Sequence, residues 1–216
     1  MQRYAPLVYL CGTVPGSYVP VWRHAVRKSN ASISGSRPSR TREGHRCQRA
    51  RPRAILRAAV PSAFDRLSDL LRALEDERVR YVLFGGQAVN LHGIPRFTED
   101  IDLFVEPTAD NVERLRRALT RVWNDPEIQQ IRAEDLAGEY AVVRYGTPDG
   151  FAVDLVARVG EAFRFEDVES ETLMLGGFPV RIATPRMLYR MKKDTLRPID
   201  HADAADLKAK FALRDD

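Results

Sequence analysis

Residues 81–106 read YVLFGGQAVNLHGIPRFTEDIDLFVE, a short apolar segment followed by a glycine pair and then by two aspartates one residue apart. Side chains alternate between faces along an extended chain, so Asp100 and Asp102 are predicted to point to one side, with Arg96 and Thr98. Two carboxylates on one face repel each other unless a cation compensates them. Mg²⁺ prefers oxygen ligands and is commonly held by one or two carboxylates together with substrate phosphates. The stretch therefore predicts a metal-dependent site for phosphate chemistry.

The glycine pair, Gly85 and Gly86, is a candidate for the phosphate side of such a site. Glycine lets the backbone approach a phosphate closely, and the start of the following helix offers free N–H groups and a partial positive charge. A plain strand-to-helix turn is the alternative interpretation.

A third carboxylate, Asp154, occurs inside the apolar segment FAVDLVA, residues 151–157. Aspartate is depleted in strands, and an unpaired charge there is costly, so something must compensate it. If this segment lies beside residues 101–105, Asp154 joins the two aspartates around a pair of metal ions, an arrangement typical of phosphoryl transfer. The alternative is a structural ion pair with Arg144 or Arg158.

Hydrophobic periodicity and turn residues predict an α+β fold in which a mixed sheet is flanked by helices and a helical pair closes the chain. The predicted strands are 81–84, 97–105, 139–145, 151–157, 172–175 and 178–183. The predicted helices are 64–79, 87–92, 109–123, 185–196 and 201–212.

Charge divides the chain into a leader, residues 1–60, and a body, residues 61–216. The leader carries twelve Lys and Arg residues against the single acid Glu43, whereas 22 basic and 29 acidic residues follow it. Rich in Ser, Gly, Pro and Arg and without apolar periodicity, the leader is predicted to be disordered, with a basic arm for nucleic acid as the alternative. Both cysteines, Cys11 and Cys47, lie in it, so a reducing cytoplasm and no membrane association are expected for the body.

The strings GGQAVNLHG, residues 85–93, and PRFTEDIDLFV, residues 95–105, resemble the AbiEii-type nucleotidyltransferases of the polymerase β-like superfamily. The signature of that family is a Gly-Gly or Gly-Ser turn followed by R-F-[ST]-x-D-[IL]-D. The resemblance covers about residues 64–212 and implies the same mixed sheet with flanking helices. One departure is Gly86, which stands where many relatives have Ser.

The resemblance also implies roles for individual residues. Asp100, Asp102 and Asp154 would bind Mg²⁺, two ions in all, and the glycine pair would hold the phosphates of an NTP. Residues 184–207, TPRMLYRMKKDTLRPIDHADAADL, are similar to the C-terminal motif of the family, although the adjacent Lys193 leaves the choice of lysine open. The expected nucleotide-binding residues are therefore Gly85, Gly86, Arg96, Thr98, Lys192 and Arg197, and Lys192 joins the three aspartates as a catalytic residue, with Asp200 able to orient it.

The expected reaction is Mg²⁺-dependent transfer of a nucleoside monophosphate from an NTP to an acceptor, with Asp154 as the base and pyrophosphate leaving. The resemblance implies an RNA acceptor such as tRNA, a toxin role in a toxin–antitoxin pair, and a cognate antitoxin protein as partner. The alternatives are a small-molecule (antibiotic) nucleotidyltransferase, a non-catalytic or antitoxin-like binding module, and a protein that binds nucleic acid through its leader. General-base roles for His92 and His201 are further alternatives.

Overall fold

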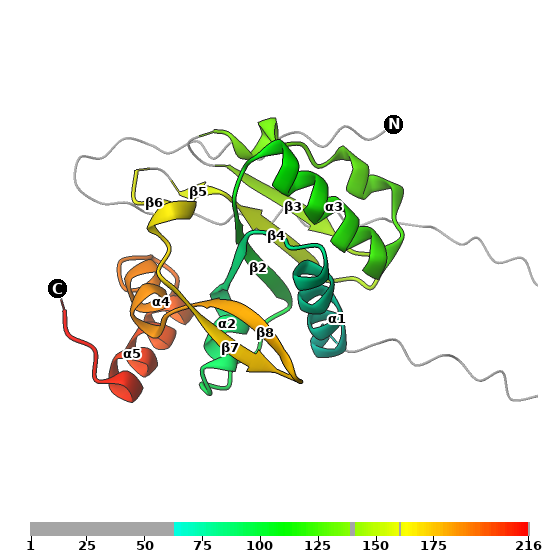
Figure 1. Ribbon diagram of the computed structural model, residues 1–216. Helices are drawn as coiled ribbons and strands as arrows, with labels where there is room; N and C mark the ends of the chain where they lie inside the picture. Colours follow the sequence, from blue (N-terminus) through cyan, green and yellow to red (C-terminus); the bar gives the residue numbers. More distant parts are fainter. Residues whose placement is uncertain (1–62, 139–140, 160, 216) are drawn as a thin grey trace, which may run out of the picture. The chain divides into compact units, whose positions relative to one another are not determined.

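The computed structural model describes residues 63–138, 141–159 and 161–215, whose centre is a mixed sheet of six strands (Figure 1). Its order is β3-β4-β2-β1-β8-β7. The pairs β2/β4 and β1/β8 are parallel, and the other three pairs are antiparallel. The strands are β1 (Tyr81–Phe84), β2 (Asp100–Val105), β3 (Val142–Gly146), β4 (Ala152–Val156), β7 (Ser170–Leu175) and β8 (Phe178–Ala183).

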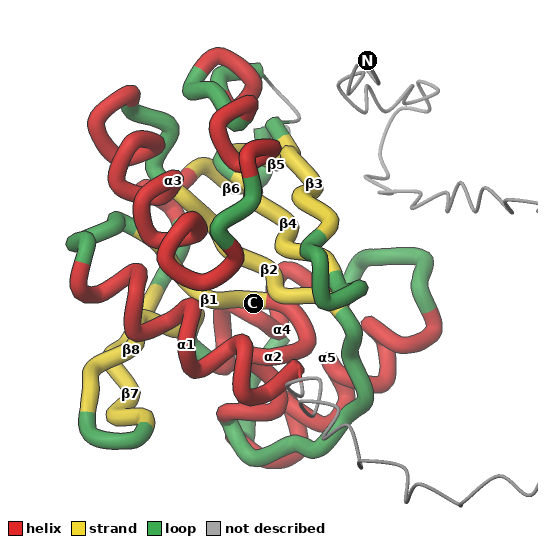
Figure 2. Tube along the Cα trace, turned by 90° about the vertical axis from the view of Figure 1, so that its right-hand side faces the viewer, coloured by secondary structure: helices red, strands yellow, loops and turns green. Residues whose placement is uncertain are grey.

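Helices cover both faces of this sheet, which confirms the predicted fold class. Helices α1 (Ala63–Asp76) and α3 (Ala109–Trp123) lie side by side on one face. Figure 2 shows α2 (Gly85–Leu91), α4 (Pro185–Lys192) and α5 (Pro198–Phe211) on the other face. Shorter elements complete the described fold: the 3-10 turns Pro126–Gln130, Glu134–Leu136 and Phe165–Asp167, and a small pair of β5 (Arg158–Val159) with β6 (Phe163–Arg164).

The helices form where apolar spacing and capping residues agree. Thr108 accepts a hydrogen bond of 3.3 Å from the backbone N–H of Asn111 at the start of α3, and Thr184 accepts one of 3.1 Å from Met187 at the start of α4. Each such cap contributes about 1 kcal/mol. The apolar stripe of α1 has the i, i+3, i+4, i+7 spacing of a helix that faces a core. Fully buried side chains of this core include Leu67, Leu70, Leu71 and Leu74 of α1, Leu83 of β1, Leu103 of β2, and Leu115 and Leu119 of α3.

Three element boundaries differ from the prediction in ways that shape the site. Helix α2 already begins at Gly85, so the glycine pair forms its first turn. Strand β2 begins at Asp100, because the backbone N–H of Arg96 donates to the side chain of Asn90 over 2.7 Å and the segment before Asp100 lies off the sheet. Helix α5 begins at Pro198, whose fixed φ and missing N–H suit the first helical position.

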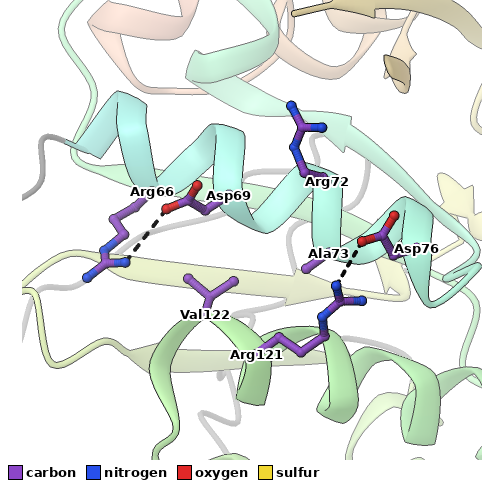
Figure 3. A pocket seen from close by; sticks show the side chains of 7 residues that line it. All are labelled: Arg66, Asp69, Arg72, Ala73, Asp76, Arg121 and Val122. Atoms are coloured by element: carbon purple, nitrogen blue, oxygen red, sulfur yellow. Dashed lines mark hydrogen bonds and ion pairs between the residues drawn. The ribbon is translucent and has the colours of Figure 1, made fainter. Parts of the chain in front are cut away.

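A hollow between α1 and α3 is lined mainly by charged side chains (Figure 3). The ion pair of Arg121 with Asp76, at 2.8 Å, joins α3 to α1 across the hollow. The ion pair of Arg66 with Asp69, at 3.7 Å, lies along α1. Its lining contains none of the residues that the sequence predicts for the site, so the hollow belongs to the packing of the two helices.

Among the described residues, no helix is both long and apolar enough to span a bilayer. The leader predicted from the sequence, residues 1–60, lies outside the described residues, and its boundary stays a prediction.

Candidate active site

The register of two parallel strands brings the predicted acidic residues together. Asp102 of β2 lies opposite Asp154 of β4, and Asp100 lies opposite Ala152. The expected neighbourhood of these two strands is thereby confirmed. Since Asp100 and Asp102 are two residues apart on one strand, their side chains share a face of the sheet with Asp154.

The electrostatics of this face favour uptake of a positive charge. Burial raises the pKa of the Asp154 carboxyl to about 7, against the attraction of Arg144 and helped by repulsion from Asp102 and Asp100. Burial, and next repulsion from Asp100, raises the pKa of Asp102 to about 6. Asp154 is only 2% exposed, and its Oδ1 atom has no hydrogen-bond partner among the described residues. These are the properties of carboxylates whose charge the protein compensates incompletely.

Arg144 of β3 is the basic residue that touches two of the three aspartates. Its Nη1 lies 3.1 Å from Asp154 Oδ2, and its Nη2 lies 2.7 Å from Asp100 Oδ1. The register explains this contact, because Arg144 lies directly opposite Asp154 in the antiparallel β3/β4 pair. The ion pair that was an alternative for Asp154 is therefore present, and it coexists with the cluster of carboxylates. Arg158 pairs with Glu161.

Gly85 is required by the position of Asp102. Its φ of +65° is in the left-handed region, and a Cβ atom there would lie within 2.5 Å of Asp102 Cγ and closer still to Oδ2. The carboxylate thus lies where any side chain at position 85 would begin. The neighbouring Gly86 donates its backbone N–H to the same carboxylate. The first turn of α2 and the second aspartate of β2 form one packed unit.

Arg96 and Thr98 lie in the segment before β2, yet both reach the glycine pair. A Cβ atom on Gly86 would lie 2.8 Å from Thr98 Cβ and 3.0 Å from Arg96 Cζ. Contacts this short require the neighbours to move, which gives a local reason for glycine where many relatives have Ser. Phe97, between these two residues, is 80% exposed.

Lys192 lies in a buried ionic cluster next to the aspartates. It is 7% exposed, and its Nζ atom is 2.6 Å from Asp200 Oδ1 and 2.8 Å from Asp203 Oδ2. Asp203 also accepts a hydrogen bond of 2.6 Å from Arg96. The positive charges of Lys192 and Arg96 both lower the pKa of Asp102, which places the cluster within electrostatic reach of the carboxylates.

The other residues considered in the sequence analysis make contacts outside the three aspartates. Arg197 precedes α5, and its Nε is 3.7 Å from Asp200 Oδ2, at the outer side of the cluster. Lys193 is half-buried near the ring of Tyr189, with Nζ 5.8 Å from the ring centre. His92 makes a hydrogen bond of 2.8 Å with the carbonyl of Ala183, and His201 makes one with the carbonyl of Thr195.

Two residues of this site were undervalued by the sequence interpretation. Asp203 is not among the residues that the sequence predicts for the site, and Arg144 is considered there only as a structural partner of Asp154. A signal for Arg144 exists in the sequence, because residues 139–145 and 151–157 are predicted as two successive strands joined by a turn, which places Arg144 on the strand that borders the one with Asp154.

The model of one protein family matches residues 68–204 of this chain. Its description is the nucleotidyl transferase AbiEii toxin of type IV toxin–antitoxin systems. The chain belongs to the AbiEii family. The match contains every residue predicted for the site, and it confirms both the resemblance and the assignment of the protein as a nucleotidyltransferase.

The chain is also similar to several solved structures, three of which follow. One is the lincosamide antibiotic adenylyltransferase LnuA with bound lincomycin, at a TM-score of 0.45 and 15% identity over 67% of this chain and 95% of that one. Another is ANT(2″)-Ia in complex with adenylyl-2″-tobramycin, with a TM-score of 0.44 and 17% identity; the match covers 68% of this chain and 87% of that one. A third is JHP933 from Helicobacter pylori, with a TM-score of 0.41 and 20% identity; the match covers 68% of this chain and 65% of that one. No curated protein matches the chain.

The carboxylates of this AbiEii domain fit a divalent cation in their chemistry. They supply hard oxygen ligands, their charge is under-compensated, and one buried oxygen of Asp154 lacks a partner. Within the described residues, no three Asp, Glu, His or Cys side chains are gathered closely enough to form a metal site. In this arrangement Asp100 and Asp154 are both paired with the guanidinium of Arg144.

Proposed function

We propose that this AbiEii protein transfers a nucleoside monophosphate from an NTP to an RNA acceptor and acts as the toxin of a toxin–antitoxin pair. The observation that carries the transfer reaction is the alignment of Asp102 with Asp154 on adjacent strands, on one face with Asp100 and beside the glycine pair. In the reaction the acceptor hydroxyl loses its proton, its oxygen bonds to the α-phosphorus, and the bond to the β-phosphate breaks as pyrophosphate leaves.

The metal-binding residues would be Asp100, Asp102 and Asp154. Mg²⁺ held there would neutralise phosphate charge and help to ionise the acceptor oxygen. Asp154 is our candidate for the base, because its buried Oδ1 atom has no hydrogen-bond partner among the described residues and could accept the proton of the acceptor.

The nucleotide would lie between the glycine pair and the ionic cluster. The glycine pair packs against Asp102, Thr98 and Arg96, so a phosphate bound there would lie next to the carboxylate of Asp102 and the metal that it would hold. Lys192 would supply a point charge to the triphosphate, oriented by Asp200 and Asp203, and Arg197 would add a second charge from the outer side.

Two observations support the toxin role and the RNA acceptor. The family description itself names a toxin of type IV systems, which also implies a cognate antitoxin. The exposed Phe97 offers a ring beside Arg96, and aromatic rings of this kind stack on unpaired bases.

Labelled nucleotides test the reaction directly. The full chain is incubated with Mg²⁺ and each NTP in turn, labelled on the α- or the γ-phosphate, together with total RNA, a protein lysate or a small-molecule extract. Transfer of the α-label but not the γ-label to RNA is expected. Label on small molecules alone would replace the RNA acceptor by the antibiotic-type alternative, and nucleotide binding without any transfer would indicate a non-catalytic module.

Two aspartate variants localise the activity. Asp102→Asn keeps the side-chain shape but removes the charge, and a loss of about 100-fold or more in label transfer is expected. Asp110→Asn on the exposed start of α3 is the matched control and should transfer label like the wild type. Transfer at the wild-type rate by Asp102→Asn would show that the site is elsewhere.

A further inference from the structure

Arg144 occupies a special place in the sheet. It lies on β3, the end strand in the sheet order, and directly opposite the buried Asp154 of β4. Its side chain is 39% exposed, whereas that of Asp154 is almost completely enclosed. One end of the arginine side chain therefore contacts buried carboxylate oxygen while the rest remains open to solvent.

The guanidinium bonds to two carboxylates from two different strands. Its Nη1 binds Asp154 Oδ2 at 3.1 Å and its Nη2 binds Asp100 Oδ1 at 2.7 Å. A guanidinium presents its donors as a rigid planar fork, so one group can satisfy two separate oxygens in a fixed geometry. Arg144 thereby holds β2 and β4 carboxylates in place across the face that carries the site.

A divalent cation would use the same carboxylates. Asp100, Asp102 and Asp154 together carry three negative charges when ionised, and Arg144 offsets one of them. Arg144 bonds to one oxygen of Asp100 and one of Asp154, so a cation on the other oxygens of these two carboxylates would lie close to the positive guanidinium, which repels it. The exposure of Arg144 gives its side chain a route into solvent without movement of the core.

We infer that Arg144 is the internal counter-ion of the metal-free site, and that its charge opposes the binding of a divalent cation by Asp100 and Asp154. This inference rests on the metal site of the proposed function. Arg144 acts as a positioning residue in it: it preserves the carboxylate arrangement until the cation arrives, and it weakens cation binding through its positive charge and its contact with one oxygen of each carboxylate. The affinity of the site for metal is then set partly by an arginine that is not itself a ligand.

Direct Mn²⁺ titration of the full chain, followed by electron paramagnetic resonance at constant ionic strength, tests the inference without using activity. Arg144→Gln removes the competing charge and should bind Mn²⁺ at least about tenfold more tightly than the wild type. Arg144→Lys keeps a charge but loses the fork and should fall between the two. Arg181→Gln makes the same change on β8, separated from β3 by three strands, and should bind Mn²⁺ like the wild type.

Thermal unfolding of the same variants provides a second readout. Without metal, Arg144→Gln should melt below the wild type because Asp154 loses its counter-ion, and saturating Mn²⁺ should raise its Tm by more than it raises that of the wild type. If Arg144→Gln fails to fold, the Arg144→Lys affinity decides. Equal Mn²⁺ affinity for wild type and the Arg144 variants would overturn the counter-ion role and leave the proposed reaction standing. No Mn²⁺ binding by the wild type, or wild-type binding retained in Asp154→Asn, would overturn the metal site and with it the counter-ion role.

Discussion

Lys192 donates a hydrogen bond of 2.6 Å to Asp200, and both side chains are buried. A buried ion pair of this kind costs much when one partner is removed, because the other charge stays behind without compensation. A substitution at position 192 therefore affects the stability of the fold and not nucleotide binding alone. It tests stability as well as nucleotide binding, and the two effects need separate readouts.

Lys192→Met should lower the free energy of unfolding by about 3–5 kcal/mol and weaken NTP binding. Lys193→Met, at the neighbouring half-buried position, should lower it by less than about 1 kcal/mol and leave NTP binding unchanged. Urea unfolding and NTP titration calorimetry measure the two quantities.

The double variant Lys192→Met/Asp200→Asn separates fold from function, because Asp203 keeps its contact with Arg96. Part of the lost stability should return while NTP affinity stays low. Recovery of NTP affinity together with stability would show that Lys192 is structural. Weak binding by Lys193→Met alone would place the lysine motif one residue later.

Gly85→Ala should abolish label transfer and destabilise the domain. The added Cβ meets the Asp102 carboxylate, and the φ of +65° adds a cost of about 1–2 kcal/mol for any residue with a Cβ. Gly177→Ala in the β7–β8 turn is the control, since its φ of +89° carries a similar backbone cost and its Cβ would meet nothing within 4 Å. Similar losses of activity in the two variants would mean that backbone strain, and not the contact with Asp102, causes the effect.

Metal-free protein should lose stability as the pH rises through 7. The pKa of Asp154 is about 7 in the folded chain, against about 3.9 in an unfolded one, so the folded state holds the proton more tightly. The resulting stabilisation is complete below about pH 4 and disappears as the pH rises through 7. Asp102, with a pKa of about 6, acts in the same direction at slightly lower pH.

Urea unfolding in EDTA between pH 4 and pH 8 measures this dependence. The Asp154→Asn variant, which cannot ionise at that position, should lose less stability over this range than the wild type, by on the order of 4 kcal/mol. Added Mg²⁺ should reduce the loss in the wild type, because a cation favours the ionised form. Parallel pH curves for wild type and variant would contradict the raised pKa.

A variant that lacks residues 1–60 should retain label transfer and its melting temperature. Every residue proposed for the site follows Pro61, and the leader has no apolar periodicity with which to complete a core. Activity assays and thermal unfolding of the shortened and full chains make the comparison. A large loss in both would show that the leader is part of the fold, whereas a loss of RNA affinity alone that depends on salt would assign it a nucleic-acid role.

The sequence predicted most of the fold because apolar spacing and turn residues agree along the body. Strand β1, helix α3 and strand β8 have the predicted bounds, and the two strands that carry the aspartates are neighbours as expected. Features that depend on contacts between distant parts of the chain were harder to predict from the sequence. The hydrogen bond from Arg96 to Asp203, 107 positions further along the chain, is one such contact.

The site shows the same division between local and long-range information. The carboxylates were recognisable because their spacing and their apolar surroundings are local properties. The ion pair of Lys192 with Asp203 joins α4 to α5, and the ion pair of Arg144 with Asp100 joins β3 to β2, two strands that are not neighbours in the sheet. Such pairs follow from how α5 and β3 dock, which is decided by the packing of the whole domain.

The shared space of Gly85 and Asp102 has an evolutionary consequence. As long as a carboxylate occupies position 102, position 85 is closed to every side chain, so the two sites cannot drift independently. A descendant that lost the aspartate would release this constraint, and Asn or Asp, which tolerate positive φ, could then enter at position 85. A glycine at position 85 would thus indicate that a relative still has a carboxylate at position 102, even where the rest of the motif is no longer recognisable.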